Sequence, residues 1–89
     1  MKKYIINMDN IVESKISDDE LVILSLESGE YLGLNSSAII VWDDLKQEKE
    51  IEEIIYNLSE IFEISIDEIE NDVLSVIDEM MVAGIIIER

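Results

Sequence analysis

Residues 24–42 read LSLESGEYLGLNSSAIIVW, and this stretch decides the fold. Two apolar runs, 24–26 and 31–34, flank a turn in which Gly29 can adopt the positive φ that tight hairpins demand. Asn35 or Ser36 then supplies a short polar side chain that accepts amide hydrogens at the start of a helix. The stretch therefore predicts a hairpin whose second strand leads directly into a helix.

Upstream residues extend this hairpin into a meander. Runs at 11–16 and 20–26 are separated by the polar turn 17–19, so 31–34 is the third strand and lies at a sheet edge. In the middle strand, alternation predicts one core-facing set and one solvent-facing set, although Leu21 and Ile23 blur it. The expected core set is Val22, Leu24 and Leu26, and the expected solvent set is Ser25 and Glu27.

Three helices are predicted downstream. The first ends near Leu45, the second spans about 50–62, and the third begins at Ser65, which forms a capping box with Glu68, and ends at Gly84. The β-branched run 85–87 suits a brief closing strand. Each helix carries an apolar stripe, which in the first consists of Ala38, Val41, Trp42 and Leu45.

The fold class that follows is α+β: a three-stranded antiparallel meander followed by three helices. With 89 residues the chain has room for one domain. We expect this domain to occupy residues 11–89, preceded by an N-terminal segment, 1–10, whose order the sequence leaves open.

The composition argues against catalysis. The sequence contains neither His nor Cys, so Ser-His and Cys-His nucleophile systems and the usual transition-metal ligand sets are excluded. The carboxylates fall mainly on polar helix faces, where solvated charge is ordinary, and no Gly-rich phosphate loop occurs. We therefore expect no enzyme activity, no catalytic residues, no cofactor and no metal site.

The net charge of −16 limits the choice of partners. Nucleic-acid affinity rests largely on Lys and Arg, so DNA or RNA binding is disfavoured, and a neutral or cationic partner fits better. The N-terminal apolar stretch is too short for a signal peptide, and no run reaches membrane length. We expect a cytoplasmic protein that binds no membrane.

Residues 24–42, with the hairpin, the Tyr-Leu-Gly-Leu-Asn run and the spacing from Ile39 to Trp42, resemble the PqqD family of pyrroloquinoline quinone biosynthesis. The likeness continues into 72–74 and 83–86. It implies a winged helix-turn-helix arrangement and a stand-alone precursor-peptide recognition element, similar to the small recognition proteins of split lasso-peptide systems. Such proteins bind the leader segment of a ribosomally made peptide and deliver it to a leader peptidase or a radical SAM enzyme.

The resemblance further implies that the leader adds as a strand beside 31–34, in a groove walled by the third helix. An edge strand supplies free backbone groups for this, and Asp72 and Glu79 would suit basic residues in the leader. The expected peptide-binding residues lie on the third strand and on one margin of the third helix: Glu30, Tyr31, Leu32, Gly33, Leu34, Ile69, Asp72, Val73, Val76, Glu79 and Met80.

Other functions stay open at this point. A DNA-binding winged helix has the right fold but the wrong charge, whereas an acidic interaction module or DNA mimic would tolerate the charge without binding a leader. A carrier protein would need an Asp-Ser-Leu-like site at a helix start, which the sequence lacks. For single side chains the alternative is structural, because Trp42 suits a core and Asp72 or Glu79 suit ordinary solvated helix charges.

Overall fold

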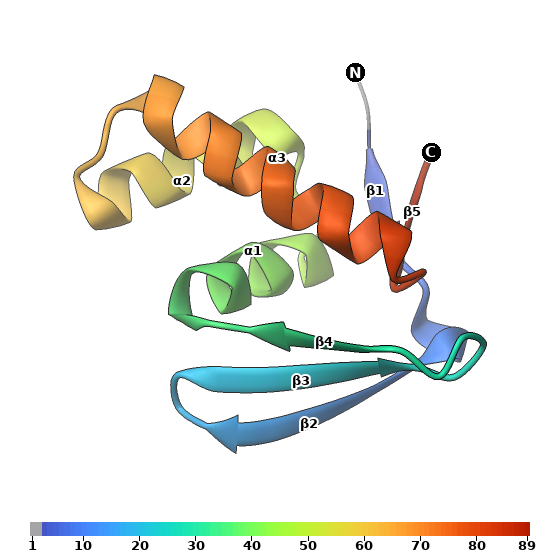
Figure 1. The fold of residues 1–89 in the computed structure, drawn as a ribbon. Coiled ribbons are helices and arrows are strands. Elements are labelled where there is room, and N and C mark those ends of the chain that lie inside the picture. The colour runs from blue at the N-terminus through green and yellow to red at the C-terminus, as the bar shows by residue number, and fades with distance from the viewer. Residues whose placement is uncertain (1–2) are drawn as a thin grey trace.

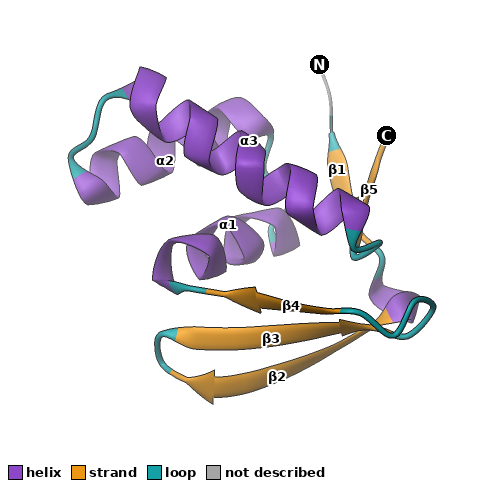
Figure 2. Cartoon of the chain, viewed as in Figure 1, coloured by secondary structure: helices purple, strands orange, loops and turns teal. Residues whose placement is uncertain are grey.

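The computed structural model describes residues 3–89, and residues 1 and 2, the start of the predicted N-terminal segment, lie outside this part. Three helices stack on one side of a three-stranded sheet, as Figures 1 and 2 show. The elements in chain order are β1 (Tyr4–Ile6), the short 3₁₀ helix η1 (Met8–Asn10), β2 (Ile11–Ser17), β3 (Glu20–Ser25), β4 (Tyr31–Leu34), α1 (Ser36–Lys46), α2 (Ile51–Phe62), α3 (Ile66–Val82) and β5 (Ile86–Glu88).

The main sheet is an antiparallel meander in the order β2-β3-β4, so β4 lies at its edge. Leu24 pairs with Val12 of β2 on one side and with Tyr31 of β4 on the other. A bulge between Lys15 and Ser17 interrupts the ladder of β2 near the first turn. Both the predicted α+β class and the predicted edge position of 31–34 are confirmed.

The predicted faces of β3 were wrong. Ile23 is fully buried and Ser25 is 1% exposed, whereas Leu26 is 56% exposed beyond the end of the strand. Apolar residues occupy both faces of β3, so hydrophobicity alone did not distinguish them. Burial of Ser25 is tolerated because its hydroxyl accepts hydrogen bonds from Asn10 Nδ2 at 3.0 Å and from the Ser28 amide at 3.4 Å.

The helices begin where their capping residues predict. Asn35 Oδ1 accepts the Ala38 amide at 3.0 Å, and Ser65 Oγ accepts the Glu68 amide at 3.4 Å. Gly84, at φ +78°, follows the end of α3 and turns the chain into β5. Within residues 3–89, no helix combines the length and apolar character that crossing a membrane requires.

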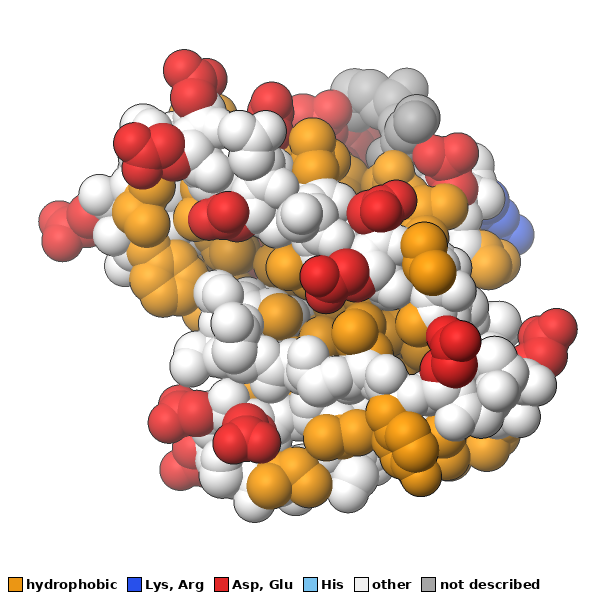
Figure 3. Space-filling view, in the orientation of Figure 1, with side chains coloured by type: hydrophobic (Ala, Val, Ile, Leu, Met, Phe, Trp, Pro, Cys, Tyr) orange, Lys and Arg blue, Asp and Glu red, His pale blue; other side chains and the backbone are white. Residues whose placement is uncertain are grey.

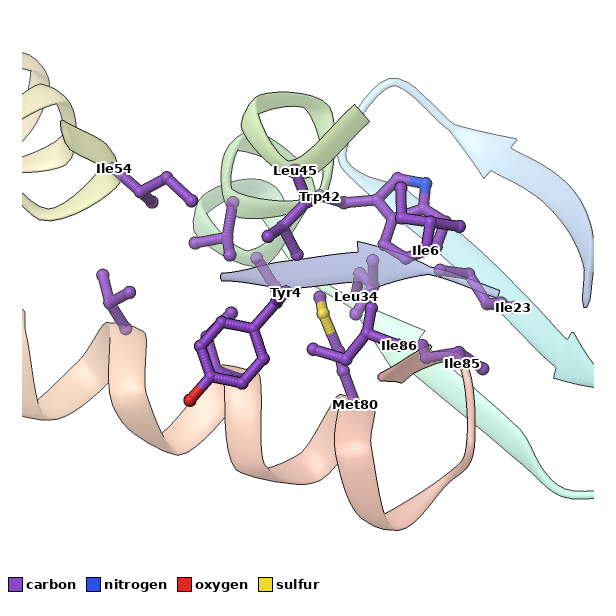
Figure 4. Close-up of a cluster of buried hydrophobic side chains, with 14 of the residues drawn as sticks. Tyr4, Ile6, Ile23, Leu34, Trp42, Leu45, Ile54, Met80, Ile85 and Ile86 are labelled. Carbon is purple, nitrogen blue, oxygen red and sulfur yellow. The ribbon is translucent and has the colours of Figure 1, made fainter. Parts of the chain in front are cut away.

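The core lies where α1 meets the sheet and the other two helices. The predicted stripe of α1 is buried, and Trp42 is fully enclosed with Ile23 of the sheet, as Figure 4 shows. Its indole Nε1 donates to Glu13 Oε1 at 2.8 Å, which ties β2 to α1. Burial of this many large apolar side chains stabilises the domain, at roughly 1.5–3 kcal/mol for each one.

A second, two-stranded sheet joins the ends of the described chain. β1 pairs antiparallel with β5, with Ile6 opposite Ile86 and Tyr4 opposite Glu88. Tyr4, Ile6 and Ile86 are buried in the common core. The sequence did not predict β1, because three residues are too few for a periodic pattern and their partner lies at the other end of the chain.

Candidate functional site

The edge of β4 presents backbone groups to solvent. The Ser25 amide donates to the Glu30 carbonyl at 2.9 Å, so the pairs Ile23–Leu32 and Leu21–Leu34 continue the hydrogen-bonded positions. By the same alternation, the N–H and C=O groups of Tyr31 and Gly33 point away from β3. These two residues therefore offer donors and acceptors to an additional strand.

The space beside β4 is bounded by helices. α1 packs against β4 on one side and against α3 on the other, so it forms a floor between an open strand edge and a long helix. Figure 3 shows hydrophobic side chains in the depression between the sheet and α3, with carboxylates on the helical side. This is a groove with one polar backbone wall and one amphipathic helical wall.

One end of the groove contains a hollow of about 220 Å³. It opens beside the start of α1, just after β4 ends, and its lining is mainly apolar with one carboxylate, Asp72. Such a cavity suits an apolar side chain of a bound molecule. The residues that line it are Ser37, Val41, Leu58, Phe62, Ile64, Ile69, Asp72, Val73 and Val76.

Four predicted residues of α3, namely Ile69, Asp72, Val73 and Val76, are brought together in this hollow. On β4, Leu32 and Leu34 face inward, whereas Tyr31 is 72% exposed on the outer face. Glu30 is exposed just before β4, and Glu79 is exposed on α3 beyond the hollow. The structure thus brings four of the predicted residues together at the hollow and leaves Glu30, Tyr31 and Glu79 outside its lining.

Met80 does not line the groove, contrary to the prediction from the sequence. Its side chain has no exposed surface and lies in the core, where Figure 4 shows it beside Ile86. The sequence placed it on the margin of a broad stripe, but the pairing of β1 with β5 covers that end of α3. Met80 therefore stabilises the fold and does not line the groove.

Sequence reasoning missed the contribution of the second helix and its following loop. Phe62 and Ile64 line the hollow and remain partly exposed, at 38% and 36%. A signal was present, because the predicted apolar stripe of α2 continued to Phe62 at the end of the helix, where the structure leaves Ile61 exposed as well. The sequence analysis gave these residues no part in peptide binding.

The groove and the opposite sheet edge differ electrostatically. At the β2 edge, Glu13 Oε1 accepts Lys46 Nζ and Trp42 Nε1, each at 2.8 Å. Burial alone would raise the pKa of Glu13, but these hydrogen bonds and the Lys46 charge outweigh it and hold the pKa below its ordinary value. The α3 wall of the groove instead carries carboxylates, and no group of three or more potential ligand side chains within 3–89 is placed to hold a metal ion.

A protein-family model decides the affiliation: PqqD, coenzyme PQQ synthesis protein D, matches residues 20–86. The chain belongs to the PqqD family. The match covers β3, β4 and all three helices, and so includes both walls of the groove. A comparison with curated proteins found no significant match.

Solved structures resemble this PqqD-family chain over nearly its whole length. TbiB1 in complex with the TbiA(beta) leader peptide is 27% identical, with a TM-score of 0.82, covering 92% of this chain and 93% of TbiB1. Lasso peptide synthetase B1 complexed with the leader peptide has a TM-score of 0.81 and covers 94% of this chain and 96% of its own. At 20% identity, the second likeness concerns the fold alone.

Proposed function

We propose that this PqqD-family chain binds the leader segment of a ribosomally synthesised precursor peptide and presents it to a modifying enzyme. The observation that carries the proposal is the outward direction of the Tyr31 and Gly33 backbone groups, opposite the α3 wall. The similarity to TbiB1, which was solved with a leader peptide, supports the same conclusion.

The leader would add to β4 as a fourth strand. Main-chain hydrogen bonds to Tyr31 and Gly33 give affinity with little dependence on sequence. Alternate side chains of an added strand point into the groove, so specificity arises where one of them reaches the hollow beside Asp72 and Val76. We expect an affinity near the micromolar range, about −8 kcal/mol, because ordering a flexible peptide offsets part of the contact energy.

Carboxylates on α3 favour a leader with basic residues. Asp72 and Glu79 lie seven residues apart, which is about 10 Å along a helix and about three residues of an extended strand. Because side chains three residues apart point to opposite faces of a strand, the two cations that meet these carboxylates would stand two or four residues apart in the leader, within reach of long Lys or Arg side chains. The surplus of acidic residues elsewhere on the chain would also speed the encounter with a cationic peptide.

The chemistry is assigned to the partner enzyme and not to this chain. With no His and no Cys in the sequence, acyl transfer and thiolate chemistry lack their usual groups. A leader peptidase of a split lasso-peptide system or a radical SAM enzyme fits the partner role. We place the encounter in the cytoplasm, where a ribosomal precursor is made.

Titration with fluorescently labelled synthetic leader peptides, drawn from any precursor genes near the gene for this protein, tests the proposal. Tyr31→Pro removes an outward N–H at the first residue of β4, where proline is tolerated in a strand. Tyr31→Ala also removes the tyrosine ring but keeps the N–H. We expect Tyr31→Pro to bind the leader at least about tenfold more weakly than Tyr31→Ala. The proline variant lacks one main-chain hydrogen bond to the leader, and the proline ring obstructs the strand edge.

Lys15→Pro provides the control at the opposite edge. By the alternation of β2, the Lys15 N–H also points outward, but away from the groove. This variant should bind within twofold of the wild-type protein. Equal affinity of Tyr31→Pro and Tyr31→Ala, or loss of binding in Lys15→Pro alone, would exclude docking on β4.

A further inference from the structure

Gly33 has no role that the fold explains. Its φ lies outside the positive range, unlike the φ angles of Gly29 and Gly84. A Cβ built on Gly33 would meet no atom within 4 Å apart from those of its two chain neighbours. Neither backbone conformation nor packing therefore requires glycine at this position of β4.

Glycine inside a strand is also costly. It loses more conformational freedom on folding than other residues and contributes no side chain to cross-strand pairs, so valine or threonine would favour the strand. A glycine kept in a strand without a conformational reason often marks a place that another molecule approaches closely. The missing side chain here lies on the outer face, opposite Val22 of β3.

An open hollow surrounds this position. It is separate from the one beside Asp72 and is lined by Glu20, Leu21, Val22, Gly33, Leu34 and Asn35. Val22 forms an apolar floor beside Gly33, and Glu20 is the one ionisable residue of the lining. Asn35 Oδ1 already accepts the Ala38 amide and the Ser37 hydroxyl, at 3.0 and 3.1 Å.

Strand geometry determines what would occupy this hollow. In an antiparallel or parallel addition, side chains of directly neighbouring residues share a face of the sheet. The added residue beside Gly33 therefore projects to the outer face, while its two neighbours project into the groove. Its side chain can lean over Gly33 because no Cβ stands in the way.

We propose that Gly33 opens a second specificity subsite, on the outer face, for a long cationic side chain of the added strand. The aliphatic stem of a Lys or Arg would cover Gly33 against Val22, and its charged end would meet Glu20. This inference rests on the proposed strand addition and deepens it. It adds a basic position to the leader on the face that points away from α3.

A double-mutant cycle between protein and peptide tests the subsite. Gly33→Val fills the hollow, and we expect its melting temperature to equal or exceed that of the wild type because the space is open. It should bind the labelled leader about tenfold more weakly. An alanine scan of the Lys and Arg residues of the leader should identify one position that weakens wild-type binding about tenfold and Gly33→Val binding by less than twofold.

Glu20→Gln separates charge from shape. It should lower the affinity for the unmodified leader about threefold and leave the affinity for the alanine-substituted leader unchanged. Gly33→Val binding as tightly as wild type, or coupling to no basic position, would overturn the subsite. Strand addition would survive that result if Tyr31→Pro still bound more weakly than Tyr31→Ala, whereas a wild-type protein that fails to bind the leader would contradict the proposed function itself.

Discussion

Asn10 Nδ2 donates to Ser25 Oγ at 3.0 Å, and both side chains are buried. The same amide nitrogen donates to the Gly84 carbonyl at 3.2 Å, while Asn10 Oδ1 accepts the Glu27 amide. One side chain thus joins η1 to the turn before β4 and to the turn before β5. The position of β4 depends on this junction, because the turn that Asn10 holds leads directly into the edge strand.

We therefore predict that Asn10→Ala lowers the free energy of unfolding by about 2 kcal/mol, since it leaves buried partners without hydrogen bonds. For a domain of this size the melting temperature should fall by roughly 10 °C, measured by circular dichroism. Asn7→Ala is the matched control, because Asn7 Nδ2 makes one long contact of 3.5 Å to the same carbonyl. Equal destabilisation by both variants would contradict the role given to Asn10.

The sequence predicted the order of the main elements but not which face of β3 is buried. Leu21 and Ile23 compete with Val22 and Leu24 on hydrophobicity, and the outcome depends on contacts with α1 and with Asn10 that lie far along the chain. The starts of the helices were predicted correctly where a capping residue such as Ser65 is present, because a cap involves only residues that are close in the sequence.

The site was predictable to a similar degree. Edge position follows from strand order, so the backbone wall was foreseen, whereas the hollow requires Phe62 and Ile64 to meet Asp72 across helices. Such a cavity depends on how the helices pack, and helical periodicity does not encode that packing. Met80 was misplaced because the β1–β5 pair that covers its end of α3 joins residues from opposite ends of the chain.

The link between Glu13 and α1 predicts a pH dependence of stability. The folded pKa of Glu13 is lowered, so its contribution is present above the ordinary value of 4.5 and is lost as pH falls through the folded pKa. Glu13→Gln should cost about 1 kcal/mol at pH 7, and the difference in stability from the wild type should close as pH falls below 4.5 and through the lowered pKa of Glu13. Urea unfolding followed by the fluorescence of Trp42, the single tryptophan, measures both.

Asp18→Asn is the control for that experiment. Its ion pair with Lys15, at 3.4 Å, is highly exposed and should contribute almost nothing. A gap between wild type and Glu13→Gln that stays constant from pH 7 to pH 3 would show that the Glu13 charge does not act in the folded state.

Met80 and Val76 lie one turn apart on α3 but differ in burial, so we expect their substitution to affect stability and leader binding differently. Met80→Ala creates a core cavity and should lower the free energy of unfolding by about 3 kcal/mol, with leader affinity within twofold where the variant is folded. Val76→Ala enlarges the hollow. It should lower the free energy of unfolding by about 1 kcal/mol but lower the affinity for the leader at least about threefold. Thermal melts and leader titrations of both variants measure these changes. Weaker leader binding by Met80→Ala than by Val76→Ala would show that Met80 contributes to the groove.

Carboxylates on the groove side of α3 should contribute to leader binding in a salt-dependent way. Asp72→Asn and Glu79→Gln should each weaken a basic leader about threefold to tenfold at low ionic strength, because each removes one charge partner at the groove. Glu70→Gln removes the same charge from the other side of α3, about 200° round the helix from Asp72, whereas Glu79 shares the Asp72 side, so Glu70→Gln reports the effect of net charge alone and should change affinity less than twofold. At 1 M salt, where the Debye length is about 3 Å, the differences among the three variants should shrink. A loss in Glu70→Gln as large as in Asp72→Asn would mean that the leader senses the overall charge of the domain and not the position of these carboxylates.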